Sequence, residues 1–240
     1  MRYAILSDIH GNLDALEAVL EDLQDAAIDT YICLGDIVGY GPQPAECLHL
    51  LQRHRAVNIA GNHDLAVANK TSISSFNLLA RTATLWTRNE LSSEDLDYLG
   101  DLPLVTHVET FEIVHGTLYA PELFDYVHTS YDANLAMSRM ETALCFIGHS
   151  HIPVNFFQRD LISYSFEKKI PVPHDGKVIV NVGSVGQPRD QDPRACFAVY
   201  DTEEEMVRIR RTRYDVDLVA EKIQRAGLPA ALGERLKLGR

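Results

Sequence analysis

The sequence predicts an α/β fold that forms a single domain over residues 1–240. Two observations lead to this prediction. Short apolar runs alternate with helical patterns near the start of the chain, as in strands that are joined by helices in a parallel sheet. Between residues 154 and 213, apolar and polar side chains alternate instead, as in antiparallel strands. With 240 residues, 46% of them hydrophobic, the chain can enclose the core of one such domain.

Two βαβ units are expected at the start of the chain. Apolar runs with strand character are each followed by a segment whose apolar side chains recur at helical spacing. Asn12 is suited to cap the first helix, and Pro44 to open the second. The expected strands are residues 2–7, 31–34 and 57–60, and the expected helices are residues 12–26 and 44–52.

The rest of the chain is expected to add helices and a second set of strands. Predicted helices lie at residues 71–100, 133–141 and 216–226, and predicted strands at 104–106, 111–114 and 144–147. The alternating segment 154–213 has turns at residues 158–160 and 174–176, so it is expected to add antiparallel strands and to form a second sheet. Residues 228–240 carry little pattern.

Charge and cysteine content narrow the function classes. The 34 acidic residues outnumber the 22 basic ones, and the net charge of −12 argues against a broad nucleic-acid or membrane surface. One basic run alternates with apolar residues and is interpreted as the solvated face of a strand, with a polyanion contact as the alternative: Arg208, Arg210, Arg211 and Arg213. Dispersed cysteines in apolar runs indicate buried thiols in a reducing compartment: Cys33, Cys47, Cys145 and Cys196. With no recognisable signal peptide or membrane-spanning stretch, we expect a cytoplasmic protein.

Polar clusters follow the predicted strands. The first three strands are followed by Asp-x-His, Gly-Asp and Gly-Asn-His-Asp, and single histidines or a His-x-His pair follow later strands. Because ligands gather at the carboxyl ends of parallel strands, these side chains are expected to meet at one edge. The candidates are Asp8, His10, Asp36, Asn62, His63, His115, His149 and His151.

This set of oxygen and imidazole donors predicts an open catalytic metal site. Such donors suit zinc, manganese, iron or cobalt better than calcium or magnesium, and no paired cysteine motif indicates a closed structural zinc site. His149 and His151 are expected to point the same way along an extended segment, with neighbouring glycines allowing a close backbone approach. Individually, Asp8, Asp36 or Asn62 could simply cap a helix, but their occurrence together with the histidines favours a metal site. The remaining histidines are interpreted as surface or core residues: His49, His54, His107, His128 and His174.

Five motifs of this chain resemble, in the same order, those of the calcineurin-like metallophosphoesterase superfamily: Asp-x-His, Gly-Asp, Gly-Asn-His-Asp, Val-His-Gly and Gly-His-Ser-His. The resemblance covers residues 2–200 and is closest to the small bacterial and archaeal phosphodiesterases, through residues 36–42 and 181–189. It implies a four-layer αββα fold in which two packed mixed β-sheets are flanked by helices.

The resemblance also implies two divalent transition-metal ions, which could be Mn, Fe, Zn, Co or Ni. One ion would be held by Asp8, His10, Asp36 and His151, and the other by Asp36, Asn62, His115 and His149, with Asp36 as the bridge. His63 would lie near the leaving-group oxygen, as a proton donor or a stabiliser of charge. A hydroxide held between the ions would attack phosphorus in line.

One departure from the superfamily affects the expected substrate. Phosphoprotein phosphatases of this superfamily carry Gly-Asp-x-x-Asp-Arg-Gly, whereas this chain has Gly39 and Tyr40 in place of the second aspartate and the arginine. The lost aspartate orients the catalytic histidine in those relatives, and the lost arginine grips phosphate. The protonation of His63 is therefore open, and a phosphoprotein substrate is disfavoured. Arg189 could replace the phosphate contact or be an exposed loop residue.

The leading hypothesis is a phosphodiesterase or nucleotide phosphohydrolase with a small phosphate-ester or nucleotide substrate. Asp8-Ile9-His10-Gly11-Asn12 also resembles diadenosine tetraphosphate hydrolases, so a dinucleoside polyphosphate is the alternative substrate. A non-catalytic interaction scaffold of the same fold is a second alternative, against which the intact Asn62-His63 argues. A nuclease is disfavoured by the acidic composition.

Overall fold

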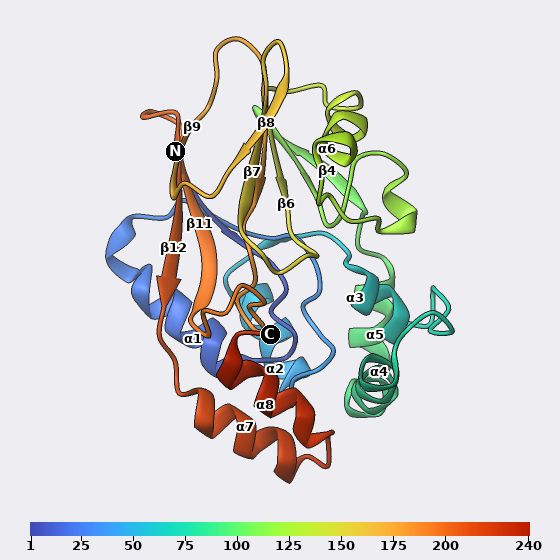
Figure 1. Ribbon diagram of the computed structural model, residues 1–240. Helices are drawn as coiled ribbons and strands as arrows, with labels where there is room; N and C mark the ends of the chain where they lie inside the picture. Colours follow the sequence, from blue (N-terminus) through green and yellow to red (C-terminus); the bar gives the residue numbers. More distant parts are fainter.

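Two six-stranded β-sheets pack face to face in the computed structural model, which describes residues 1–240 (Figure 1). The first sheet has the strand order β3-β2-β1-β11-β12-β9, and the second β4-β5-β6-β10-β7-β8. Helices α1 and α2 cover the outer face of the first sheet, and α6 covers the second. The predicted αββα arrangement of two mixed sheets is therefore confirmed.

The boundaries of the elements are as follows. The strands are β1 (Arg2–Leu6), β2 (Thr30–Cys33), β3 (Val57–Asn58), β4 (Val105–Val108), β5 (Phe111–Val114), β6 (Leu144–Ile147), β7 (Val154–Gln158), β8 (Ile162–Ser165), β9 (Lys169–Pro171), β10 (Lys177–Asn181), β11 (Ala195–Asp201) and β12 (Met206–Thr212). The helices are α1 (Leu13–Asp22), α2 (Pro44–Arg53), α3 (Asn62–Val67), α4 (Leu78–Glu90), α5 (Ser93–Gly100), α6 (Ser130–Met137), α7 (Val216–Arg225) and α8 (Ala230–Leu238), with 3₁₀ turns η1 (Gln24–Ala26) and η2 (Pro121–Leu123).

Each sheet contains three neighbouring parallel strands. In the first sheet, β1, β2 and β3 run parallel, as the two predicted βαβ units require. In the second, β5, β6 and β10 run parallel. The remaining pairs are antiparallel. Each sheet therefore contributes the carboxyl ends of three neighbouring parallel strands to one edge of the sandwich.

The main core lies between the two sheets. Ile5 and Ile32 of the first sheet share one apolar cluster with Phe111 and Phe146 of the second, and all four are fully buried. The ring of Phe111 packs edge-on against that of Phe146, with the centroids 5.3 Å apart. Burial of each such side chain stabilises the fold by roughly 1.5–3 kcal/mol, so the sheets hold their connecting loops in fixed positions.

The single helix predicted over residues 71–100 is wrong, because two capping residues divide this segment. Asn77 begins α4 by accepting a hydrogen bond from the Ala80 N–H at 3.0 Å. Ser92 begins α5 with a capping box, in which Ser92 Oγ and the Asp95 carboxylate accept each other's backbone N–H. Residues 71–77 form a loop instead of helix.

Two other parts of the chain also differ from the prediction. Segment 154–213 does not form one unit: β7, β8 and β10 join the second sheet, whereas β9, β11 and β12 complete the first. The helix predicted at residues 133–141 is shifted, because Thr129 caps α6 and the helix ends at Met137. Residues 228–240, whose sequence shows little periodicity, contain helix α8. This helix packs against α7 at the bottom of Figure 1.

Three arginines of the basic run lie on β12, and Arg213 follows that strand; the run is only partly a solvated face. Arg208 and Arg210 are partly exposed and form ion pairs with Glu204 and Asp22. The Arg211 side chain, by contrast, is 7% exposed and pairs with Asp190. Ion pairs thus neutralise these three arginines. No helix in the structure combines the length and apolar character needed to cross a membrane.

Candidate metal centre

The predicted ligand residues come together where the parallel strands of both sheets end. Asp8 follows β1, Asp36 follows β2, and Asn62 begins α3 just after β3. From the second sheet, His115 follows β5, and the loop after β6 carries the His-x-His pair. Backbone hydrogen bonds hold these loops to one another, for example from the Asp8 N–H to the Gly35 oxygen at 3.0 Å and from the Gly148 N–H to the His115 oxygen at 2.9 Å.

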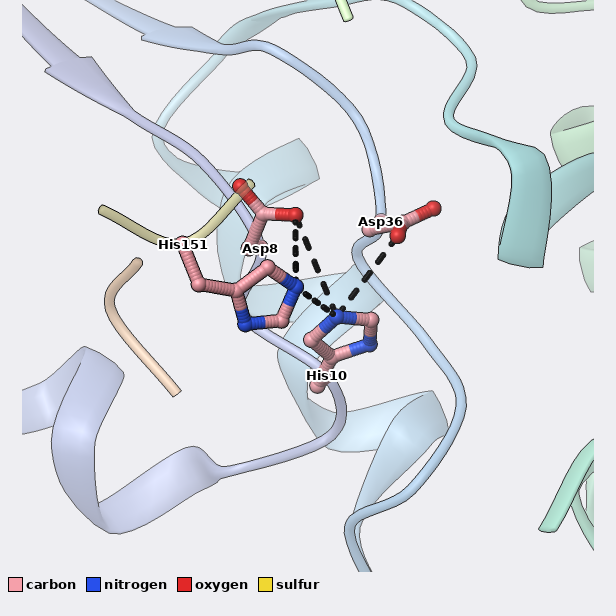
Figure 2. Close-up of side chains that lie close together, drawn as sticks. All are labelled: Asp8, His10, Asp36 and His151. Carbon is pink, nitrogen blue, oxygen red and sulfur yellow. Dashed lines mark hydrogen bonds and ion pairs between the residues drawn. The ribbon is translucent and has the colours of Figure 1, made fainter. Parts of the chain in front are cut away.

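One group of buried donors surrounds the imidazole of His10 (Figure 2). His10 Nε2 lies 3.2 Å from His151 Nε2, 3.5 Å from Asp36 Oδ2 and 3.9 Å from Asp8 Oδ1. His151 Nε2 lies 3.2 Å from Asp8 Oδ1. Because these donor atoms all face a common centre, the four side chains could hold one metal ion.

A second group shares Asp36 with the first. His115 Nε2 lies 3.4 Å from Asp36 Oδ2 and 3.1 Å from His149 Nδ1. The oxygen Asp36 Oδ2 therefore faces both groups, from a position between His10 and His115. The other oxygen, Oδ1, accepts the His63 N–H at 2.8 Å, which fixes the orientation of the carboxylate.

The donor atoms of the two groups fit metal ions. His10, His115 and His151 each place Nδ1 within 3.0 Å of a backbone carbonyl oxygen, so Nδ1 carries the proton and Nε2 is left as a donor to a cation. Asp8 Oδ1 and Asn62 Oδ1 are buried without a hydrogen-bond partner. Burial opposes a proton on His115, but Asp36 and Asp8 outweigh it and raise the pKa of His115 to about 9. The cluster therefore attracts positive charge.

The backbone of the centre is strained at five of the donor residues. Left-handed conformations, with φ between 50° and 64°, occur at Asp8, His10, Asp36, His149 and His151. His149 and His151 are thus not part of an extended segment, and the expectation that they point the same way is wrong. The turn between them sends His149 to the second group and His151 to the first. Strain of this kind persists where the surrounding structure fixes it, as at many functional sites.

Glycines allow the loops to approach the donors, as predicted. A Cβ atom at Gly61 would lie 2.1 Å from Asp36 Oδ1, and one at Gly148 would lie 1.9 Å from Ser7 Oγ. Both distances are far below van der Waals contact, so no larger residue fits without displacing Asp36 or the end of β1.

Asp64 is a positioning residue that the sequence did not single out. Its buried carboxylate accepts the N–H groups of Asp36 at 2.7 Å, Gly61 at 2.9 Å and Val38 at 3.2 Å. It thereby holds the loop after β2 against the start of α3. Burial, reinforced by the charge of Asp36, raises the pKa of Asp64 to about 7. The only signal in the sequence is its place in Gly61-Asn62-His63-Asp64.

His63 is held by aromatic packing. Its ring centroid lies 4.6 Å from that of Tyr40, 4.8 Å from that of Phe76 and 5.0 Å from that of His10. His63 Nδ1 is buried without a hydrogen-bond partner. Burial, which outweighs the attraction of Asp36, lowers the pKa of His63 to about 4, so the ring is neutral at pH 7 in the metal-free protein.

A cleft of about 460 Å³ opens beside the second group. His63, Asn62 and His149 form its floor. Its walls combine aromatic rings with hydroxyl and amide groups from the loops 71–77 and 122–126, including Phe76, Phe124, Tyr126, Ser72 and Asn77. The ring of Tyr126 stacks on His149 at 4.1 Å between centroids, so the cleft leads directly to the donor cluster. A small organic phosphate can therefore reach the centre.

Comparison with known proteins agrees with this geometry. Residues 1–205 match the sequence model of the Calcineurin-like phosphoesterase superfamily domain. The chain is 39% identical to the protein MJ0912 of Methanocaldococcus jannaschii over 99% of this chain and 98% of that protein. It is 25% identical to the phosphodiesterase YfcE of Escherichia coli over 84% of this chain and 94% of that protein. The crystal structure of a metallophosphoesterase from Sphaerobacter thermophilus superposes with a TM-score of 0.88, at 37% identity over 100% of this chain and 99% of that chain.

The chain therefore belongs to the calcineurin-like phosphoesterase superfamily. It is a metal-dependent hydrolase of phosphoric esters, with a buried cluster of aspartates and histidines that could bind the metal.

Proposed function

We propose that the protein is a dinuclear phosphodiesterase in which Asp36 bridges two divalent cations. Asp8, His10 and His151 would complete the site of one cation, and Asn62, His115 and His149 that of the other. The observation that carries the proposal is the position of Asp36 Oδ2, which lies 3.5 Å from His10 Nε2 and 3.4 Å from His115 Nε2. A carboxylate oxygen between two sets of imidazole donors is suited to bridge two ions.

The two cations, when bound, would supply Lewis-acid activation of water and of the phosphate oxygens. The chain's own residues prepare the site for this chemistry. Carbonyl oxygens fix three imidazole rings through Nδ1, and the His63 N–H fixes Asp36. His63 and Asn62 line the cleft, where the His63 ring can hydrogen-bond to the leaving-group oxygen as that oxygen gains charge.

Charge at the site favours a phosphate substrate, although the protein carries a net charge of −12. Two divalent cations would bring four positive charges, while Asp8 and Asp36 remove two and the neutral ligands none. The pocket would thus retain about two positive charges. Screening over roughly 8–10 Å limits the repulsion from the acidic surface.

The cleft and the relatives support a small diester or nucleotide as the substrate. A volume of about 460 Å³ accommodates a small organic molecule. The relative from Escherichia coli is a phosphodiesterase. Manganese, iron, zinc, cobalt and nickel all suit the donors, so availability decides among them.

Replacement of the proposed bridge tests this function. In Asp36→Asn, hydrolysis of bis-p-nitrophenyl phosphate in added Mn²⁺ should fall at least about 100-fold, because the bridging charge is lost. Metal analysis should also show fewer than two bound ions per chain. The exposed Asp97→Asn provides a matched control that removes one carboxylate from α5, a helix that carries none of the proposed ligands. Wild-type turnover by Asp36→Asn would refute the assignment.

A further inference from the structure

Two arginines from distant parts of the chain lie over the ring of Tyr40. Arg189 belongs to the loop after β10, and Arg235 lies on α8. The guanidinium carbon of each is 5.9 Å from the centroid of the Tyr40 ring. Both side chains are partly buried. Two positive charges have thus been brought close together at one aromatic residue.

Neither arginine pairs with the side chain of an aspartate or a glutamate. Arg189 Nη2 donates to Gln187 Oε1 at 2.9 Å, and its Nε is buried without a hydrogen-bond partner. Arg235 Nε donates to the terminal oxygen of Arg240 at 3.1 Å, and its side chain also hydrogen-bonds to Tyr40. The neighbouring Asp190 is paired with Arg211 instead. In a chain with twelve more acidic than basic residues, two guanidinium groups at one tyrosine that no acidic side chain neutralises indicate a place for an external anion.

The arginine pair adjoins the donor cluster. The Tyr40 ring centroid lies 4.8 Å from that of His10 and 4.6 Å from that of His63. The Arg189 N–H donates to the His151 oxygen at 3.2 Å. After burial, the Arg189 charge is the largest influence that lowers the pKa of His151, and burial followed by Arg189 lowers the pKa of Arg235. Arg189 is therefore the inner member of the pair, and Arg235 is one step further from the centre.

We propose that Arg189 and Arg235 bind a second phosphate group of the substrate, next to the phosphate that is cleaved. This inference rests on the proposed function and refines its substrate to esters with at least two linked phosphates, the chemistry of a dinucleoside polyphosphate. Guanidinium groups bind phosphate oxygens through charge-assisted hydrogen bonds, and a bound anion would offset the effect of the Arg189 charge on Arg235. Arg235 lies beyond residues 1–205, which match the superfamily model. In this proposal, the C-terminal helix α8 therefore adds a preference for a second phosphate to the metal centre of the superfamily domain.

Direct binding of inorganic pyrophosphate to the metal-free protein tests the subsite without turnover. Calorimetry should show that Arg235→Gln weakens binding about tenfold or more, because a charge-assisted hydrogen bond is lost. Arg189→Gln should have at least as large an effect. The control Arg225→Gln removes an exposed arginine of α7 that pairs with Glu221. It should change the dissociation constant less than about twofold. Thermal unfolding should verify that each variant is folded.

Substrate selectivity provides the second measurement. In Arg235→Gln, the ratio of kcat/KM for diadenosine tetraphosphate to that for bis-p-nitrophenyl phosphate should fall about tenfold. Unchanged pyrophosphate binding in Arg235→Gln, or no binding to the wild-type protein, would overturn the subsite. If binding depends on Arg235 but no ester is hydrolysed, the proposed function fails and the anion site stands. If turnover persists with an unchanged ratio, the subsite fails and the function stands.

Discussion

At the scale of single residues, His63 depends on packing for its orientation. The position that carries an aspartate in phosphoprotein phosphatases is Gly39, and a Cβ there would lie 2.9 Å from His63 Nδ1. Without a side chain at residue 39, this nitrogen has no carboxylate partner. Tyr40 and Phe76 hold the ring from its sides instead. The neutral state of His63 follows from this apolar environment.

A leaving-group series measures what His63 contributes. His63→Gln should lower kcat by about 10²–10⁴-fold for phenyl diesters, where much charge accumulates on the departing oxygen. For p-nitrophenyl diesters the loss should be clearly smaller, because that leaving group needs less assistance. Metal content should stay at the wild-type level, since His63 is not among the proposed ligands. An equal loss for both leaving groups would show that His63 does not contact the departing oxygen.

At the scale of elements, the α7–α8 hairpin fixes one wall of the site. Leu232 and Leu236 of α8 share an apolar cluster with Tyr40, and Val219 of α7 joins it. Lys222 of α7 also reaches Asp14 of α1, with Nζ 2.7 Å from Oδ2. The hairpin is therefore anchored to the catalytic part of the fold and holds Arg235 against Tyr40.

Removal of a buried leucine should show how much this anchoring contributes. Leu232 is fully buried, so Leu232→Ala should lower the free energy of unfolding by about 2–5 kcal/mol through lost burial and a cavity. The same change at Leu238, which is 56% exposed on the same helix, should cost less than about 0.5 kcal/mol. Denaturant unfolding of both variants measures the difference. Equal stabilities would mean that α8 does not pack as described.

At the scale of the whole molecule, the two sheets jointly create one cluster of donors. Two buried carboxylates, four imidazoles and five left-handed residues are unfavourable in the absence of a cation. The packing of both sheets, which the donor loops connect, offsets this unfavourable free energy. Ions that bind this cluster only in the folded state must therefore stabilise the whole protein.

Metal removal should consequently lower the melting temperature. Addition of Mn²⁺ to chelator-treated protein should raise Tm, with a stabilisation of about 2.7 kcal/mol when the free ion is 100-fold above its dissociation constant. Differential scanning calorimetry measures the shift. In Asp36→Asn, which lacks the proposed bridge, the shift should be much smaller. A wild-type Tm that does not respond to any of the candidate transition metals would contradict the proposed centre.

Local patterns in the sequence predicted much of the fold and which polar residues lie close together. Apolar periodicity located the strands β1, β2, β5 and β6, because burial of one face imposes it on the chain. The clusters after these strands are close in space because parallel strands end at a common edge. The break in the helix at residues 91–92 was missed, although Ser92 and Asp95 form a capping box that was present in the sequence.

The sequence by itself determined the α/β class, the order of the early strands and the chemical types of the donors, since each follows from neighbouring residues. Only the tertiary structure decided which sheet each later strand joins, how His149 and His151 separate into two groups, and that Asp64 holds Asp36. It also brought Arg235 to Tyr40, nearly 200 residues away along the chain. These features depend on packing between distant segments, and short-range periodicity carries no information about which distant surfaces meet.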